Sequence, residues 1–405
     1  MQSFTEIEEK SLNAVNKWYQ EYQKIEYFNQ KKVLNAFREC RINYQHFQLT
    51  SGYGMGDVGR DTLETLWSKI FKSEDSLIRQ QIVSGTHAIS LALFAMLLPN
   101  DEIVFLGKPY DTLFKVLGET DKDPGTLREL GVKVKFHPLS DIEGLTKTVT
   151  KTTKVLYIQR SKGYEFRNAL TIKEMENIIS KVKKQYPNII VFVDNCYGEF
   201  TETMEPLEVG ADLIAGSLIK NPGAAIAPSG GYLSGRGDLI ERAAYKLTAP
   251  GVGKEIGPSL ISNSTLYHGI FAAPHVVAEA LKGTIYIASI MQILGYKILP
   301  QIEDTRSDIV EAICFDDAEK MKSFCRGIQK YSPVDSYVYL EPWEMPGYSD
   351  EVIMASGGFV EGSSIELSAD GPLREPYVCY VQGGTSFTYI KLVMDSILQE
   401  EWGIV

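Results

Sequence analysis

Apolar residues recur along this chain with two different periods. Across residues 1–47, positions such as Leu12, Val15, Trp18 and Tyr22 lie three or four residues apart, which is the period of an amphipathic α-helix. This pattern predicts a helical arm at the N-terminal end. Farther along, up to about residue 217, short runs rich in valine and isoleucine alternate with longer helical patterns. That alternation predicts crossover units and an α/β fold with a mostly parallel sheet.

The pattern changes after about residue 265. A long helical stretch is predicted over roughly 270–294, followed by short strand patterns in hairpin-like succession with few helices between them. The segments VYLEP (338–342) and SSIELS (363–368) are interpreted as two of these strands. These patterns predict a smaller α+β domain. We place the domain limits at 1–50 for the helical arm, 51–285 for the large domain and 286–405 for the small domain.

Composition narrows the class of protein. The chain has 405 residues, of which 44% are hydrophobic and 23% charged, and its net charge of −11 argues against nucleic-acid or anionic-membrane partners. Its five cysteines are widely spaced and include no C-x-x-C pair, so we predict neither a disulfide framework nor a metal site. An acidic start, MQSFTEIEEKSL, and a longest apolar run of only Leu91 to Leu98 predict a soluble, cytoplasmic protein.

Three features of the large domain point to one ligand. The segment 84–86 (Ser-Gly-Thr) follows a strand pattern and opens a helix, where free N–H groups and the helix dipole favour an anion. Asp194 ends an apolar strand, and ligands of doubly wound sheets bind beyond the carboxyl ends of strands. Lys220 directly follows another strand pattern and precedes a Pro-Gly turn. Each feature alone also has an ordinary explanation, as a turn, a helix cap or a solvated lysine.

Together these features have the layout of a pyridoxal-phosphate site. A helix N-terminus suits the phosphate, a lysine amine forms a Schiff base with the aldehyde, and a carboxylate keeps the pyridine nitrogen protonated so that the ring works as an electron sink. Eleven of the 34 glycines fall within residues 198–257, far more than an even spread would place there. Glycine allows backbone to approach a ligand closely, so this cluster supports a ligand site in the same region.

At these residues the chain resembles a known family. The segments VDNCYGEF (193–200) and GSLIK (216–220) are similar to cofactor segments of the cystathionine and methionine lyases, which are fold-type I enzymes. Four further segments resemble the cystathionine β-lyase-like proteins associated with aluminium resistance: GYGMGDVGRDTLE, QIVSGTHAISLALFAMLLPND, TAPGVGKEIG and SSIELSADGPLREPY. The resemblance covers roughly residues 45–400. It implies a large domain with a sheet of the seven-stranded type, pyridoxal 5′-phosphate as cofactor, and a smaller C-terminal domain.

The resemblance also implies roles for individual residues. Lys220 matches the Schiff-base lysine and Asp194 the acid that pairs with the pyridine nitrogen. Tyr110 resembles the tyrosine that stacks on the ring, and it is our candidate proton donor. The positions that match phosphate-binding residues are Gly85, Thr86, Ser217 and, reaching a neighbouring subunit, Tyr53.

The sequence departs from the well-studied lyases near the cofactor. Ile219 stands where they carry a threonine before the lysine. Met55 stands where they carry an arginine, for which Arg60 is a nearby substitute. Two further residues have open roles: His87 either faces the cofactor or only packs and caps the helix, and Cys196 is more simply a small buried residue than a catalytic thiol.

The arginine that grips the substrate carboxylate has a different local context here than in those lyases. Arg374, in the segment GPLREPY, is our candidate for this role, with Arg160 and Arg167 as rivals. An arginine suits the task because its planar guanidinium can hold a carboxylate through two parallel hydrogen bonds.

The function implied is a carbon–sulfur lyase acting on a sulfur-containing amino acid, in a homodimer or homotetramer with shared active sites. The alternatives are another pyridoxal-phosphate reaction, such as transamination or retro-aldol cleavage, and a protein that retains the cofactor while acting in stress tolerance through binding. The sequence alone does not separate β- from γ-elimination, and it offers no carboxylate cluster that would explain aluminium resistance.

Overall fold

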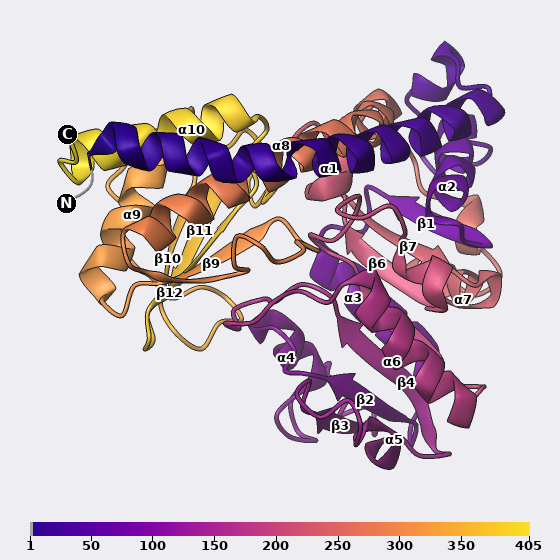
Figure 1. Ribbon diagram of the computed structural model, residues 1–405. Helices are drawn as coiled ribbons and strands as arrows, with labels where there is room; N and C mark the ends of the chain where they lie inside the picture. Colours follow the sequence, from indigo (N-terminus) through magenta and orange to yellow (C-terminus); the bar gives the residue numbers. More distant parts are fainter. Residues whose placement is uncertain (1–2) are drawn as a thin grey trace.

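The computed structural model describes residues 3–405, which form two sheets with helices packed around them (Figure 1). Its α-helices are, in chain order, α1 (Phe4–Glu39), α2 (Val58–Phe71), α3 (Gly85–Met96), α4 (Asp111–Leu117), α5 (Leu145–Thr148), α6 (Ile172–Gln185), α7 (Gly237–Leu247), α8 (Asn263–Ile293), α9 (Ala318–Lys330) and α10 (Phe387–Ser396). Short 3₁₀ turns and one π turn, Ile397–Glu401, connect or extend them.

The larger sheet has seven strands in the order β1-β7-β6-β5-β4-β2-β3. Neighbours from β6 through β5, β4 and β2 to β3 are parallel, and only β7 runs against its two neighbours, so the predicted mostly parallel sheet is confirmed. Because β4, β5 and β6 are buried on both faces, they are nearly continuous apolar runs. The strands are β1 (Asp75–Arg79), β2 (Glu102–Leu106), β3 (Lys133–His137), β4 (Thr153–Gln159), β5 (Ile190–Asp194), β6 (Leu213–Ser217) and β7 (Gly231–Gly235).

The sequence patterns do not reveal β7, because glycines occupy both its ends and leave only three residues to carry a strand signal. Those glycines are required by close backbone packing. A Cβ at Gly235 would lie 2.2 Å from the Asp212 carbonyl oxygen, and one at Gly231 would lie 2.6 Å from a methyl carbon of Ile82. The residues that hide the strand from sequence reasoning are therefore the ones that allow it to pair.

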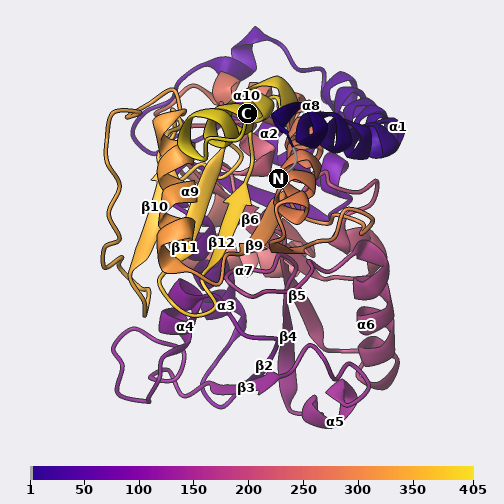
Figure 2. The ribbon, with the colours of Figure 1, turned by 60° about the vertical axis from the view of Figure 1, so that its left-hand side comes forward.

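The second sheet has five strands, all antiparallel, in the order β10-β11-β12-β9-β8. This arrangement confirms a smaller α+β unit in the C-terminal part of the chain. Figure 2, turned from the view of Figure 1, shows this sheet above the larger one with α9 and α10 packed around it. The strands are β8 (Lys297–Leu299), β9 (Val310–Cys314), β10 (Val352–Ser356), β11 (Ser368–Pro372) and β12 (Val378–Gln382).

Two strands predicted in this part are wrong. Residues 338–342 are irregular, and Tyr339 is 69% exposed with the Arg326 guanidinium 4.2 Å from its ring centre, so its apolar signal reflects a surface contact. Residues 363–367 form a buried turn, and β11 begins only at Ser368. Ile365 is fully buried in this turn, which packs so tightly that a Cβ at Gly383 would lie 2.3 Å from the Ser364 carbonyl oxygen.

The helical arm and α8 lie side by side along the top of Figure 1 and span both parts of the molecule. The predicted helix over 1–47 is confirmed as α1, which ends at Glu39 and is followed by a turn and a short 3₁₀ helix; residues 1–2 lie outside the described range. It buries a stripe that includes Ile7, Val15, Tyr22 and Val33. The predicted limit at residue 285 falls inside α8, so the domain limits stay a prediction.

The α8 helix begins at Asn263, earlier than its apolar pattern suggests. It is the one helix among the described residues that is long and apolar enough to cross a membrane. However, 78% of its apolar window is buried against the rest of the protein. We therefore describe it as the central core helix of this fold.

Candidate active site

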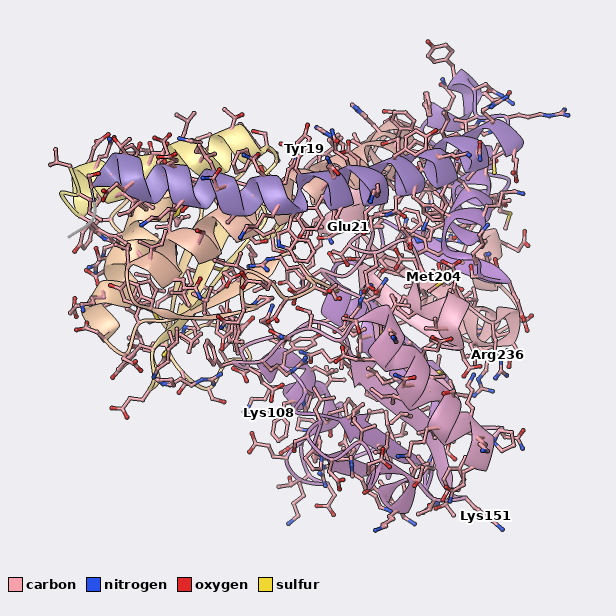
Figure 3. All side chains as sticks on the ribbon, viewed as in Figure 1. Tyr19, Glu21, Lys108, Lys151, Met204 and Arg236 are labelled. Atoms are coloured by element: carbon pink, nitrogen blue, oxygen red, sulfur yellow. The ribbon has the colours of Figure 1, made fainter. Side chains whose placement is uncertain are left out.

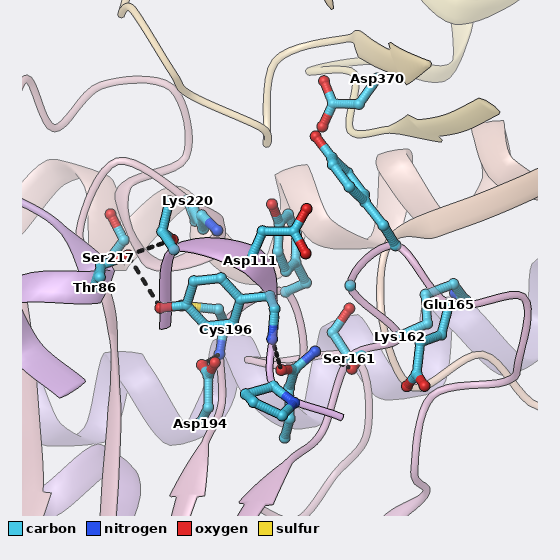
Figure 4. Close-up of a pocket in the computed structure, with 18 of the residues that line it drawn as sticks. Thr86, Asp111, Ser161, Lys162, Glu165, Asp194, Cys196, Ser217, Lys220 and Asp370 are labelled. Atoms are coloured by element: carbon cyan, nitrogen blue, oxygen red, sulfur yellow. Dashed lines mark hydrogen bonds between the residues drawn. The ribbon is translucent and has the colours of Figure 1, made fainter. Parts of the chain in front are cut away.

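A cavity lies between the carboxyl ends of the large-sheet strands and the second sheet (Figure 4). Seven of the predicted site residues line it: Gly85, Thr86, Tyr110, Asp194, Ser217, Lys220 and Arg374. They come from the start of α3, the start of α4, the ends of β5 and β6, and the loop after β11. Lys108, labelled in Figure 3, is exposed and also lines the cavity, so it marks the opening to solvent. The fold thus gathers residues that are up to 289 positions apart, from Gly85 to Arg374.

Asp194 is the last residue of β5 and is 4% exposed. Its Oδ1 accepts the Cys196 backbone N–H at 3.1 Å, and its Oδ2 accepts the Tyr157 hydroxyl at 3.2 Å. Burial raises the pKa of Asp194, and Lys220 and the Cys196 N–H oppose that rise. A carboxylate that is fixed by neutral donors and faces the cavity is suited to hold a protonated nitrogen of a ligand.

Lys220 follows β6, and its Nζ lies 3.7 Å from the ring centre of Tyr197. Burial alone would lower the pKa of the Lys220 ammonium, but Tyr197, Cys196 and Asp194 together hold it above its usual value. Tyr197 has a φ of +71°, a conformation that is uncommon outside glycine. Asn221 stabilises this backbone, because its side-chain amide donates to the Tyr197 carbonyl at 2.9 Å.

The anion-binding corner consists of the N-terminus of α3 and the end of β6. The Ser84 side chain caps α3 by accepting the His87 N–H at 3.0 Å, which leaves the N–H groups of Gly85 and Thr86 directed at the cavity end. A Cβ at Gly85 would lie 3.2 Å from Cys196 Sγ and 3.4 Å from Ser217 Cβ, so a glycine keeps this corner open. The Thr86 and Ser217 side chains also line the cavity.

Tyr110 directly precedes the first turn of α4, and it lines the cavity. Its hydroxyl is 3.0 Å from Thr86 Oγ1, and its backbone N–H donates to Gln159 Oε1 at 3.2 Å. Burial, followed by the nearby Asp194 charge, raises the pKa of Tyr110 well above its usual value. The phenol therefore stays protonated at neutral pH, as a proton donor must.

The structure separates the three candidate arginines. Arg374 lines the cavity, where its guanidinium donates to Asp350 Oδ2 at 2.9 Å and to the Tyr164 carbonyl at 3.1 Å. Arg160 is fully buried and paired with Glu202 at 2.9 Å. Arg167 pairs with a neighbouring glutamate at 2.9 Å and lines a different, shallower hollow. Of the three, only Arg374 faces the cavity that holds Lys220.

Tyr53 lies outside the cavity and is 73% exposed. Its loop is fixed against the loop after α7, because Gly54 has a φ of +61° and a Cβ there would lie 2.6 Å from Pro258 Cα. Arg60 holds the two loops together through the carbonyls of Gly54 and Gly257, each at 2.8 Å. Within this chain, Arg60 is therefore a buried structural residue of the loop pair.

His87 is a helix-capping residue, and Cys196 is a buried thiol beside the cavity. His87 Nδ1 accepts the Val83 N–H at 3.2 Å, which is a capping contact at the start of α3, and burial lowers the pKa of its imidazole. Cys196 lines the cavity, but burial and the Asp194 charge raise the pKa of its thiol well above the usual value. A thiol in that state is a poor nucleophile at neutral pH.

Sequence reasoning missed four cavity-side residues. Tyr197 contacts Lys220 and lies inside the segment VDNCYGEF, whereas Tyr157, in β4, donates its hydroxyl to Asp194 without lining the cavity itself. Tyr164 and Asp370 line the wall formed with the second sheet. Asp370 lies inside the segment SSIELSADGPLREPY, but no local pattern separates it from a surface acid, because its burial depends on β10, β12 and the loop after β4.

The residues present fit pyridoxal phosphate. The anion corner provides N–H groups and hydroxyls that would hold the phosphate, Asp194 would hold the ring nitrogen, and Lys220 lines the same cavity. A glycine at position 85 suits this corner, because a Cβ there would crowd Cys196 Sγ at 3.2 Å. In the described part of the chain, residues 3–405, no group of three or more His, Cys, Asp or Glu is placed to hold a metal ion.

The chain is similar to known proteins along almost its whole length. The sequence profile of the Methionine gamma-lyase family matches residues 4–402. A Clostridium acetobutylicum structure, whose name proposes a cystathionine beta-lyase involved in aluminium resistance, has a TM-score of 0.94 and 46% identity, over 98% of this chain and 94% of that one. A Clostridium novyi structure, named as a carbon-sulfur lyase involved in aluminium resistance, has a TM-score of 0.94 and 44% identity, over 98% and 96% of the two chains.

Among the sequence relatives, the uncharacterised protein YnbB of Bacillus subtilis is 45% identical over 394 residues, which are 95% of this chain and 94% of that protein. These matches run through the arm and both sheets and confirm the resemblance, the fold type and the cofactor expected from the sequence. The chain belongs to the Methionine gamma-lyase family of fold-type I enzymes, whose cofactor is pyridoxal 5′-phosphate.

Proposed function

We propose that this protein is a carbon–sulfur lyase that eliminates a thiol from a sulfur-containing amino acid. The observation that carries this proposal is the convergence of Lys220, Asp194 and Tyr110 in one cavity that also contains a carboxylate-binding candidate, Arg374. A base, an electron-sink partner and a proton donor are what an elimination needs. The names of the related proteins support a cystathionine β-lyase-like or methionine γ-lyase-like reaction.

When bound, pyridoxal phosphate supplies the electron sink for the charge that develops at the substrate Cα. Asp194 would pair with the ring nitrogen and favour its protonated form, because the carboxylate is buried and held by two neutral donors. Lys220 would hold the cofactor through Nζ and, once released as a neutral amine, would accept the Cα proton. Tyr110, whose phenol is held protonated, donates a proton to the departing thiolate. Arg374 binds the substrate carboxylate with a guanidinium that Asp350 and the Tyr164 carbonyl already orient.

A second copy of the chain is part of this proposal. Tyr53 is the one predicted cofactor residue outside the cavity, and its loop presents Tyr53 and Met55 to solvent at 73% and 70% exposure. Val83, directly before the anion corner, is 70% exposed as well. Exposed apolar side chains around one site are suited to an interface, so we propose a homodimer or homotetramer in which Tyr53 reaches a neighbouring site.

The test starts with the cofactor. Purified protein should be yellow, with a visible absorbance band that borohydride bleaches, and Lys220→Ala protein should be colourless. Cystathionine, methionine and cysteine conjugates are then followed for release of thiol, ammonia and keto acid. Pyruvate plus thiol supports β-elimination, and 2-oxobutyrate plus thiol supports γ-elimination.

Two results would contradict the lyase. A keto acid formed without thiol release, with the cofactor left in its amine form, would show a transaminase. A cofactor-loaded protein that is inert across a broad amino-acid panel would show a binding protein. A Lys220→Ala protein that keeps the visible band would contradict the cofactor assignment itself.

A further inference from the structure

Asp370 occupies the middle strand of the cavity's second wall. It lies in β11, between β10 and β12, where it pairs in register with Met354 and Tyr380. Its side chain is 8% exposed, yet it lines the same cavity as Lys220. In Figure 4, Asp370 and Asp194 lie on opposite sides of the cavity.

The partners of Asp370 are neutral. Gln382 Nε2 donates to Asp370 Oδ2 at 3.2 Å, and the Tyr164 hydroxyl lies against the same carboxylate. Within residues 3–405 it forms no ion pair, whereas the nearby buried acids Asp308 and Glu311 each have a cation 2.8 Å away. A buried carboxylate without a cationic partner is costly unless a ligand supplies the cation.

Asp370 remains available as an anion near neutral pH. Burial raises the pKa of its carboxyl to about 6, while the Tyr164 hydroxyl, Gln382 and the Lys220 charge limit that rise. Of the other three acids that line the cavity, Glu165 is paired with Arg167 at 2.9 Å, Asp194 lies beside Lys220, and Asp111 is partly exposed at the start of α4. Asp370 is thus the acid on the second wall that is left without a protein counter-charge.

One tyrosine joins this acid to the carboxylate-binding candidate. The Tyr164 carbonyl accepts from Arg374 at 3.1 Å, and the hydroxyl of the same residue faces Asp370. Its ring is held by stacking on Tyr380, with ring centres 5.2 Å apart. Tyr164 thus contacts both Arg374 and Asp370. A ligand whose α-carboxylate binds Arg374 therefore lies close to the Asp370 carboxylate.

We propose that Asp370 is a specificity-determining residue that binds a cationic group on the distal side chain of the substrate. This inference rests on the proposed lyase and narrows its substrates to amino-acid thioethers that carry a second ammonium beyond the sulfur. A thioether with a purely alkyl distal group leaves the Asp370 carboxylate buried and unpaired, so it is the poorer substrate.

The experiment compares two thioethers that differ only at the end of the side chain, S-(2-aminoethyl)-L-cysteine and S-propyl-L-cysteine. With cofactor-loaded wild-type protein we expect kcat/KM to favour the aminoethyl compound by about 10- to 100-fold, the value of one charge-assisted hydrogen bond in a buried site. Asp370→Asn should remove most of this preference and leave cleavage of the propyl compound within about threefold. Glu165→Gln, which removes a cavity acid already paired with Arg167, is the matched control and should keep the preference.

Binding provides a readout that does not depend on cleavage. The dissociation constants of L-lysine and of its isostere L-2-aminoheptanoate, measured by calorimetry on the loaded protein, should show the same preference and the same loss in Asp370→Asn. If neither thioether is cleaved but lysine still binds more tightly in an Asp370-dependent way, the lyase proposal fails and this inference stands. If both thioethers are cleaved equally well by wild-type protein, or if Asp370→Asn weakens both ligands equally, this inference is overturned and the lyase stands.

Discussion

The two walls of the cavity are built in different ways. The wall from the seven-stranded sheet takes Asp194, Ser217 and Lys220 directly from strand ends, where the backbone itself fixes them. The wall from the second part takes Arg374 and Tyr348 from loops and Asp370 from the middle of a strand. On the first wall, strand order alone brings the chemistry together. On the second, position depends on side chains such as Asp350, Gln382 and Tyr164.

This difference indicates that the two walls have different functions. The first wall carries the groups that hold the cofactor and move protons, and strand ends of a buried sheet hold them rigidly. The second wall carries Arg374 and Asp370, which we propose bind the charged groups of the substrate. We therefore expect changes on the first wall to alter kcat for every substrate and changes on the second wall to alter KM and substrate preference.

The largest effect is expected for Asp194→Asn. Loss of the carboxylate removes the charge that keeps the ring nitrogen protonated, and kcat should fall by about 100- to 1000-fold for all substrates. The measurement is steady-state kinetics with both a cationic and an alkyl thioether. Asp370→Asn is the matched change on the other wall. A selective loss for one substrate in Asp194→Asn, or a general loss of kcat in Asp370→Asn, would contradict the different functions that we assign to the two walls.

A buried acid behind the first wall should make stability depend on pH. Burial raises the pKa of Glu199 to about 8, against the opposing hydrogen bond from the Tyr232 hydroxyl at 2.7 Å. Because the folded state holds this proton more tightly than the unfolded chain, its stabilising contribution is present below pH 4.5 and is lost as the pH rises toward 8.

The free energy of unfolding should therefore fall between pH 6 and 8 by up to about 1.4 kcal/mol per pH unit relative to Glu199→Gln. Urea unfolding of both proteins at the two pH values measures this difference. Parallel pH profiles of the two proteins would show that Glu199 does not carry the dependence.

On the second wall, Arg374→Lys should raise KM by about 10-fold while kcat stays within about threefold. Lysine keeps the charge but loses the planar fork that binds a carboxylate through two hydrogen bonds. Arg167→Lys is the control, because that arginine lies beside the cavity wall but lines a different hollow. A fall in kcat with unchanged KM would place Arg374 in the proton-transfer step instead.

The smallest effects are expected from two tyrosines that support one acid on each wall. Tyr157→Phe removes the donor to Asp194 Oδ2, and it should lower kcat severalfold for every substrate, which corresponds to about 1 kcal/mol. Tyr164→Phe removes the hydroxyl beside Asp370, and it should change the ratio of the two thioether activities while preserving kcat for the better one. If Tyr157→Phe instead changed the ratio of the two activities and Tyr164→Phe lowered kcat for every substrate, the two walls would not act separately.

The main groups of the first wall can be predicted from the sequence. Each of its residues lies at the end of an apolar run or at the start of a helix, so Asp194, Lys220 and the anion corner at Gly85 follow from local pattern, and parallel strand ends must meet at one edge of the sheet. The family resemblance then named their roles. The fold's main elements followed for the same reason, except for β7, whose glycines conceal it, and two false strands, whose apolar residues are surface or turn residues.

The arrangement of the second wall follows only from long-range packing. Arg160, Arg167 and Arg374 are indistinguishable as sequence. The folded chain buries Arg160 against Glu202 and pairs Arg167 with its neighbour Glu165, so that only Arg374 faces the cavity. Asp370 resembles any surface acid until the sheet buries it and leaves it without a cation. A local pattern can report the ends of elements, but whether a charged side chain finds a partner depends on segments brought together by folding.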